Sequence, residues 1–105
     1  MAYQVRFTKS AREDLKRLYR FLLEQDMHAA NHALLAINKA VDLMSAFPFS
    51  CRKAQADNPL IRELIISFGS KGYVALFEIE SDTWVTILAL RHQREDDYYW
   101  AFDEF

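Results

Sequence analysis

The spacing of hydrophobic and polar residues changes along the chain and divides it into two regions. Residues 3–7 alternate between apolar and polar, which predicts a short strand with one buried face. From residue 11 to residue 47 the apolar positions recur every three or four residues, the period of an amphipathic helix, with a break at residues 26–28. This region is therefore predicted to form an antiparallel helical hairpin.

Local sequence marks the ends of these two helices. Thr8 or Ser10 can act as the N-cap of the first helix, and Ser10 with Glu13 matches a capping box, in which each side chain satisfies a backbone N–H of the first turn. Pro48 is expected to end the second helix, because proline disfavours helical geometry in the preceding residue. A polar loop is then expected from Pro48 to Pro59.

Beyond this loop the period changes to two. Strands are predicted at residues 60–68, 73–80 and 83–91, and their short connections indicate a three-stranded antiparallel meander. The predicted order is β-αα-βββ, a two-layer α+β fold with one sheet packed against one helical hairpin. Residues 1–105 are expected to form a single domain.

Composition and charge narrow the class of protein. An apolar fraction of 51% supplies a core, and a net charge of −2 argues against a general nucleic-acid binder. The charge is uneven, because residues 95–105 hold five acidic residues and no lysine or arginine. The remaining 94 residues carry 13 basic and 10 acidic residues, a charge of +3. A mildly basic body therefore precedes an acidic, aromatic tail.

Cysteine usage and hydrophobic runs indicate where the protein works. Cys51 is the only cysteine, which excludes an internal disulfide and a four-cysteine zinc site and favours a reducing cytosol. No apolar run follows the N-terminus as in a signal peptide, and none approaches the roughly 18 residues needed to span a bilayer. A cytoplasmic protein that contacts no membrane is expected.

The densest cluster of polar residues follows the last predicted strand. It contains Arg91, His92, Arg94 and Tyr98. These groups could bind an anion or serve acid–base chemistry, and a solvated strand end whose charges pair locally would give the same pattern. The cluster alone does not separate the two interpretations.

Other candidate sites are weaker. His28 and His32 lie four residues apart, as zinc ligands on a helix can, but no third ligand is evident, so no metal or other cofactor is expected. A basic stripe on the first predicted helix could face an acidic partner or only solvent. Five of the last eight residues are aromatic, so the tail is expected to fold onto the domain's own sheet or to dock on a partner.

Four segments together form a more specific pattern. They are Tyr3-Gln4-Val5-Arg6-Phe7-Thr8, Arg62-Glu63-Leu64, Gly72-Tyr73-Val74-Ala75-Leu76-Phe77 and Ile87-Leu88-Ala89-Leu90-Arg91-His92-Gln93-Arg94. The pattern covers about residues 3–98 and resembles the ParE-type plasmid-stabilisation toxins of the RelE/ParE superfamily. Its most specific part is the closing stretch ILALRHQREDDY, which ends at Tyr98.

The resemblance implies the toxin component of a type II toxin–antitoxin system. Such a toxin is neutralised by a small ParD-like antitoxin that folds on binding, and ParE-type members are associated with inhibition of DNA gyrase. The candidate target surface consists of Arg62, Arg91, His92, Arg94 and Tyr98. The candidate antitoxin-binding surface consists of Arg12, Lys16, Tyr19 and Arg20. Arg62 could equally have a structural role by pairing with Glu78 or Asp96.

The sister RelE-type toxins cut messenger RNA on the ribosome, with basic side chains on the sheet and an arginine and a tyrosine near the last strand. Here the segment from Arg62 to Ile66 lacks the alternating lysines, and Val74 stands where such a nuclease carries arginine. Cations contribute strongly to stabilising the phosphorane-like transition state of RNA cleavage. A protein-binding toxin without catalytic residues is therefore favoured over an mRNA endonuclease. A degenerate member that binds its antitoxin and poisons nothing is the third possibility.

Overall fold

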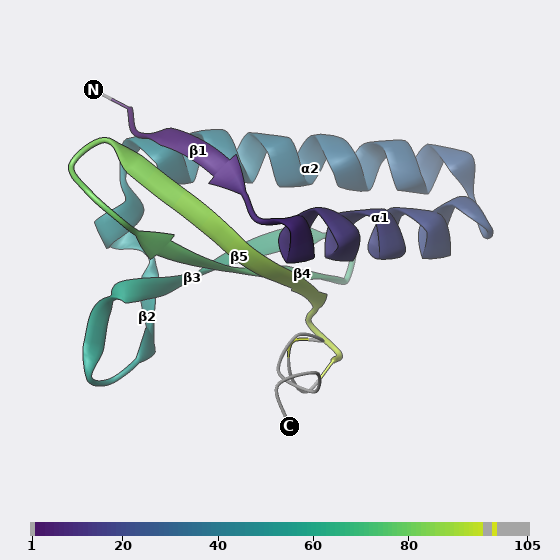
Figure 1. Ribbon diagram of the computed structural model, residues 1–105. Coiled ribbons are helices and arrows are strands. Elements are labelled where there is room, and N and C mark those ends of the chain that lie inside the picture. The colour runs from purple at the N-terminus through teal and green to yellow at the C-terminus, as the bar shows by residue number, and fades with distance from the viewer. Residues whose placement is uncertain (1, 96–97, 99–105) are drawn as a thin grey trace.

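The computed structural model describes residues 2–95 and residue 98 (Figure 1). Its elements are β1 (Gln4–Phe7), α1 (Lys9–Leu23), α2 (Met27–Ala46), the 3-10 turn η1 (Pro48–Ser50), β2 (Arg52–Gln55), β3 (Asn58–Phe68), β4 (Lys71–Ile79) and β5 (Trp84–His92). The α+β class, the N-terminal strand and the helical hairpin are confirmed. The three strands of the meander are also confirmed, as β3, β4 and β5.

The sheet is larger than the sequence predicted. Within the described residues it has five strands in the order β1-β5-β4-β3-β2. Strand β1 is not separate from the meander but pairs in parallel with β5, so that Val5 lies opposite Val85. The other neighbours are antiparallel. Pairing with β5 satisfies backbone groups of β1 that would otherwise need water or side chains.

The segment from Pro48 to Pro59, predicted as a loop, contains η1 and β2. Strand β2 pairs with β3, and Arg52 lies opposite Glu63. The prediction was wrong because β2 is a short edge strand with mostly exposed residues, so no hydrophobic alternation marks it. Pro59 is the second residue of β3, near the strand start where proline is tolerated.

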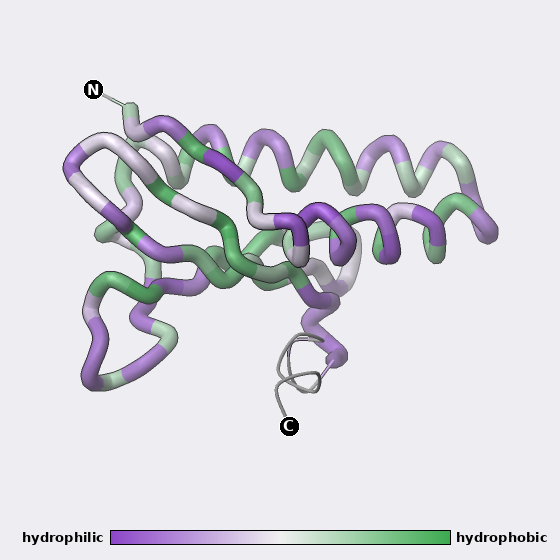
Figure 2. Tube along the Cα trace, viewed as in Figure 1, coloured by the Kyte–Doolittle hydropathy of each residue, from purple (hydrophilic) through white to green (hydrophobic). Residues whose placement is uncertain are grey.

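The helical hairpin covers one face of the sheet (Figure 1), and the main core lies between the two layers. The buried small residues Ala11, Ala30 and Ala33 leave room for the helices to approach their neighbours. Figure 2 shows hydrophobic residues concentrated along the central strands. The largest fully buried side chains are Phe77, Ile66, Ile87, Leu90 and Val85.

The opposite face of the sheet carries a second, smaller cluster of apolar residues. Val74, Leu76 and Ala89 are buried there beneath Tyr98, which is only 6% exposed. The first aromatic residue of the predicted tail therefore folds back onto the domain's own sheet. Residues 96–97 and 99–105 of the tail lie outside the described residues.

A β-bulge interrupts β5 and reverses its alternation. Leu76 lies opposite Ala89 while the next residue, Phe77, lies opposite Ile87, so Leu88 is an extra residue in β5. Ile87 packs in the main core, whereas Leu88 and Ala89 both belong to the cluster on the other face. Residues after the bulge therefore point to the opposite face from the one that strict alternation would give them.

Thr8 joins the start of α1 to this bulge. Its hydroxyl accepts a hydrogen bond from the backbone N–H of Ala11 at 3.1 Å and donates one to the Leu88 carbonyl at 3.0 Å. Thr8 is thus the N-cap, and the capping box predicted for Ser10 and Glu13 was wrong, because the helix already begins at Lys9.

The second helix begins and ends as local sequence dictates. Asp26 caps α2 by accepting the N–H groups of His28 and Ala29, and Pro48 follows the end of the helix as expected. Within the described part of the chain, neither helix combines the length and the hydrophobicity that crossing a membrane requires.

Replacing Thr8 with alanine is expected to lower the free energy of unfolding by about 2 kcal/mol, since it removes both the cap and the hydrogen bond to the bulge. Ser10→Ala, two residues further on, is the matched control and is expected to change it by less than about 0.5 kcal/mol. Urea denaturation of both variants measures the difference. Equal losses would contradict the assignment of Thr8 as the cap.

Candidate functional site

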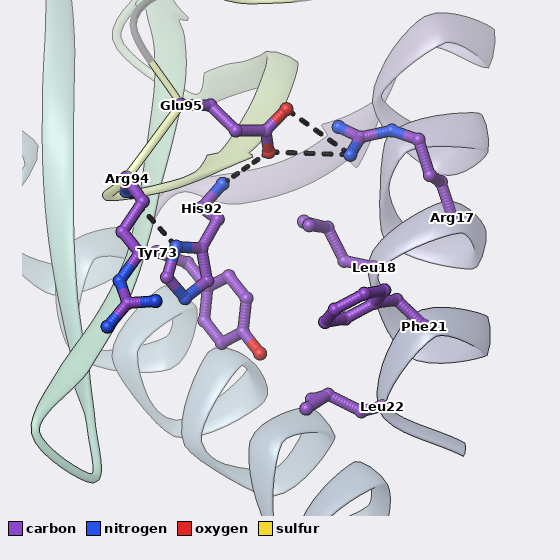
Figure 3. Close-up of a pocket in the computed structure, with 8 residues that line it drawn as sticks. All are labelled: Arg17, Leu18, Phe21, Leu22, Tyr73, His92, Arg94 and Glu95. Atoms are coloured by element: carbon purple, nitrogen blue, oxygen red, sulfur yellow. Dashed lines mark hydrogen bonds and ion pairs between the residues drawn. The ribbon is translucent and has the colours of Figure 1, made fainter. Parts of the chain in front are cut away.

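A cavity of about 430 Å³ opens between the second half of α1 and the end of β5 (Figure 3). Its lining residues are Arg17, Leu18, Phe21, Leu22, Tyr73, His92, Arg94 and Glu95. Apolar side chains come mainly from the helix, and charged groups come from both sides. The cavity is the candidate site because it combines a concave apolar surface with several convergent polar groups.

Helix and strand periods explain why these residues meet. Arg17, Leu18, Phe21 and Leu22 recur at the spacing that places side chains on one helix face. His92 is the last residue of β5, and the bulge at Leu88 turns its side chain toward the helical layer.

Strand β4 contributes the floor of the cavity on the sheet side. Tyr73 lies opposite His92 in the register, and their rings meet edge to face with centroids 5.6 Å apart. In Figure 3 the Tyr73 ring projects between His92 and the helix. Burial raises the pKa of Tyr73, so its hydroxyl stays protonated at neutral pH.

Glu95 fixes the turn that follows β5. Its Oε1 accepts the backbone N–H of His92 at 2.8 Å, and its own backbone N–H donates to the His92 carbonyl at 3.0 Å. The same carboxylate pairs with the Arg17 guanidinium at 3.3 Å. The turn is thereby held against α1, which sets the width of the cavity.

A buried carboxylate extends this network into the protein. Asp14 is 5% exposed and accepts the backbone N–H of Leu90 at 3.0 Å, and Arg17 lies 3.7 Å away. Burial raises the pKa of Asp14, although the hydrogen bond from Leu90 and the charge of Arg17 oppose the rise. Asp14 and Glu95 share Arg17, so the helix and the strand end form one hydrogen-bonded unit.

His92 is held in one orientation at the edge of the cavity. Its Nδ1 accepts the backbone N–H of Arg94 at 3.1 Å, which leaves the proton of the neutral ring on Nε2. Burial lowers the pKa of His92, and the charges of Arg94 and Lys71 lower it further while Glu95 opposes them. The imidazole is therefore mainly neutral at pH 7 and offers an N–H donor.

The predicted target surface is divided between the two faces of the sheet. His92 and Arg94 line the cavity, whereas the Arg91 guanidinium lies over the Tyr98 ring on the other face, 5.2 Å from its centroid. Arg91 donates to the backbone carbonyl of Glu95 at 2.7 Å.

Arg62 lies in a third place, beside η1. It donates to the carbonyls of Phe49, Cys51 and Pro59, each at 2.8 Å, and its guanidinium lies over the Phe49 ring. These contacts take the place of the suggested ion pair with Glu78, and Asp96 lies outside the described residues. Arg62 thus holds together the segment that leads from α2 into the sheet.

The predicted antitoxin-binding residues lie on the outer side of α1. Arg12, Lys16 and Arg20 are exposed, while Tyr19 is half-buried and donates from its hydroxyl to Asn31 of α2 at 3.0 Å. They form a stripe next to the cavity-lining face and do not line the cavity.

Arg17, Phe21, Tyr73 and Glu95 line the cavity and were missed by sequence reasoning. Phe21 offered a signal, because it is a large apolar residue beyond the stripe formed by Leu18 and Leu22. Within the described part of the chain, no three His, Cys, Asp or Glu residues gather as metal ligands could.

Comparison with known proteins identifies the family. The family model of the ParE toxin of the type II toxin–antitoxin system, parDE, matches residues 5–97. The chain belongs to the ParE toxin family.

One relative agrees with this assignment. The ParE-family chain is 37% identical over 86 residues to Toxin RelE3 of Caulobacter vibrioides, covering 81% of this chain and 88% of that protein. Among solved structures, a chain of the chromosomal ParDE TA system from P. aeruginosa matches with a TM-score of 0.69 at 17% identity, covering 87% of this chain and 96% of that one. A conserved hypothetical protein of Helicobacter pylori matches with a TM-score of 0.55 at 20% identity, covering 90% and 98%. These two structures share the fold.

Replacing Arg62 with methionine is expected to lower the free energy of unfolding by about 2 kcal/mol, because three backbone carbonyls lose a charged donor. Arg12→Met, at an exposed position of α1, is the control and should stay within about 0.5 kcal/mol of the parent protein. Urea denaturation of both variants provides the comparison. Equal stability of the two variants would show that Arg62 is free for another role.

The raised pKa of Asp14 predicts a pH dependence of stability. The folded protein binds this proton more tightly than the unfolded chain, so the contribution of Asp14 favours folding at low pH and is lost as pH rises above the ordinary value of 3.8. Asp14→Asn removes this contribution while keeping an acceptor for Leu90. The difference in unfolding free energy between parent and variant, measured from pH 3 to 7, should fall with rising pH; a constant difference would contradict the assignment.

Proposed function

We propose that this ParE-family toxin acts by binding a protein, with DNA gyrase as its target, and that a ParD-like antitoxin neutralises it. Family membership supports the toxin role.

The state of Tyr98 is the observation that carries the proposal. Its hydroxyl donates to the Glu63 carboxylate at 2.6 Å, and the ring is buried against the sheet. Burial and the neighbouring Glu63 raise the pKa of Tyr98 well above its ordinary value. A hydroxyl that holds its proton this tightly and already donates it to a carboxylate is poorly suited to accept a proton from a ribose 2′-hydroxyl.

The surroundings of Tyr98 also fit a structural role better than RNA cleavage. Arg91, the nearest cation, covers the Tyr98 ring and donates to the Glu95 carbonyl. The middle of this sheet face is made of Val74, Leu76 and Ala89. An apolar surface with an engaged arginine offers little stabilisation to a pentacovalent phosphate.

The exposed residues on the outer side of α1 are suited to binding an antitoxin. Arg12, Lys16 and Arg20 are exposed on it, and no ion pair involves any of them among the described residues. Unpaired surface cations steer an acidic partner toward the helix through their long-range field. An antitoxin segment rich in Asp and Glu would be complementary to this surface.

The proposal is tested by expressing the toxin from an inducible promoter in bacteria, with and without a co-expressed ParD-like antitoxin. Plasmid supercoiling and RNA integrity are followed beside growth. Tyr98→Phe is expected to keep full growth arrest, since it removes hydroxyl contacts such as the hydrogen bond to Glu63 and leaves the ring buried against the sheet. Cleaved transcripts with unchanged supercoiling, abolished by Tyr98→Phe, would instead assign the toxin to the RelE-type endonucleases.

A double variant tests the polar end of β5 in an assay with purified gyrase. His92→Ala with Arg94→Ala is expected to weaken inhibition of purified gyrase by about tenfold, the effect of losing roughly 1.4 kcal/mol at an interface. Lys39→Ala, an exposed cation on α2, should have no effect. Thermal melting verifies that each variant is folded. Full gyrase inhibition by the double variant would exclude this end of β5 from the target contact.

A further inference from the structure

We propose that the cavity between α1 and the turn after β5 is a docking pocket for one bulky apolar side chain flanked by a carboxylate, carried by an acidic segment of a partner protein. This inference rests on the proposed function in one respect, namely that the partner is a protein. The chemistry proposed for the bound side chain follows from the residues that line the cavity.

The apolar part of the pocket comes from the helix and from β4. Leu18 and Leu22 form one wall, Tyr73 forms the floor, and Phe21 stands at the rim with 62% of its surface exposed. A volume of about 430 Å³ lies within the range of roughly 300–1,000 Å³ that is typical of ligand sites. A phenyl or indole side chain entering it would remove apolar surface from water on both partners.

The polar part of the pocket lies beside the apolar part. The Arg94 guanidinium makes no hydrogen bond or ion pair with any described residue, and Figure 3 shows it next to the His92 ring. His92 offers its Nε2–H because Nδ1 already accepts from the backbone of Arg94. A cation next to an N–H donor is complementary to a carboxylate.

The pocket is built before any partner arrives. Glu95 locks the turn through the His92 backbone N–H, and Arg17 ties this carboxylate to α1. Asp14 in turn fixes Arg17 and the end of β5. A pocket whose walls are already fixed loses little conformational entropy when it is filled, which favours binding.

The surface around the cavity favours a protein segment over a small metabolite. Phe21 exposes 62% of its surface at the rim, so apolar surface reaches the outside of the cavity. On the outer side of the same helix, Lys16 and Arg20 are exposed cations. A ligand confined to the cavity would leave both features uncovered, whereas an acidic amphipathic segment lying along α1 would cover them.

Three tripeptides probe this chemistry on the full chain by two-dimensional NMR. Acetyl-Asp-Phe-Glu-amide carries the proposed combination, acetyl-Lys-Phe-Lys-amide reverses its charge, and acetyl-Asp-Ala-Glu-amide removes the bulky group. The first is expected to shift the resonances of Leu18, Leu22 and Arg94 and to bind at least about fivefold more tightly than either control, the effect of about 1 kcal/mol.

Matched pairs of variants locate the binding. Arg94→Gln and Phe21→Ala are each expected to weaken binding of the first peptide about fivefold. Lys39→Gln removes an exposed cation from α2, and Phe47→Ala removes a side chain that is 66% exposed at the far end of α2. Both controls should bind as the parent chain does. Phe21 and Phe47 are similarly exposed, so a loss confined to Phe21 reports on the cavity and not on general surface hydrophobicity.

Several outcomes would overturn the proposal. Equal binding of the three peptides, or shifts that avoid Leu18 and Leu22, would show that the cavity does not select this chemistry. Shifts of the same resonances with rising protein concentration, without peptide, would assign the cavity to a second copy of the chain. Because the measurement uses neither growth nor gyrase, its failure is distinguishable from a failure of the proposed function.

Discussion

Strand β5 extends beyond the strand that covers its outer edge, and the fold depends on how the exposed backbone groups are satisfied. β1 ends at Phe7 opposite Ile87, where the chain turns away into α1. Beyond that point, three side chains supply the hydrogen-bond partners that a longer β1 would have given to the backbone of β5. Thr8 donates to the Leu88 carbonyl, Asp14 accepts the N–H of Leu90, and Glu95 accepts the N–H of His92. Buried backbone polar groups need such partners, so helix and strand are placed relative to each other by hydrogen bonds as well as by packing.

The bulge at Leu88 decides what the closing motif of the sequence can do. Beyond the bulge, successive side chains of β5 point to opposite faces, so Arg91 and His92 do not share one site. Because of the bulge, the side chain of His92 and not that of Arg91 faces the helices. Arg91 instead lies on the other face of the sheet, where it packs on Tyr98. A motif that is continuous in sequence thus contributes to two surfaces with different chemistry.

Much of the fold could be predicted from the sequence because its elements carry strong local signals. The helical hairpin and the three long strands follow from hydrophobic period, and Pro48 marks the end of α2 as its ring geometry requires. β2 was missed because an exposed edge strand has no buried face to leave a pattern. Thr8 and Ser10 were both candidate caps, and the capping box at Ser10 was wrong because α1 already begins at Lys9. The second hydrogen bond of Thr8, to Leu88 at a distance of 80 positions, has no local signal in the sequence. For the site, His92 and Arg94 were found as a polar cluster. Arg17 and Glu95 form their pair across 78 positions, which no local pattern encodes.

The parallel pairing of β1 with β5 also has a consequence for how the molecule is made. Gln4 lies opposite Trp84, so β1 leaves the ribosome about 80 residues before the strand that pairs with its edge. Translation adds about 5–20 residues per second, so several seconds separate the two segments. Until β5 emerges, the hairpin has no complete sheet to cover, and neither the bulge nor the cavity exists. The cavity and the paired edge of β1 therefore form only after β5 has been synthesised.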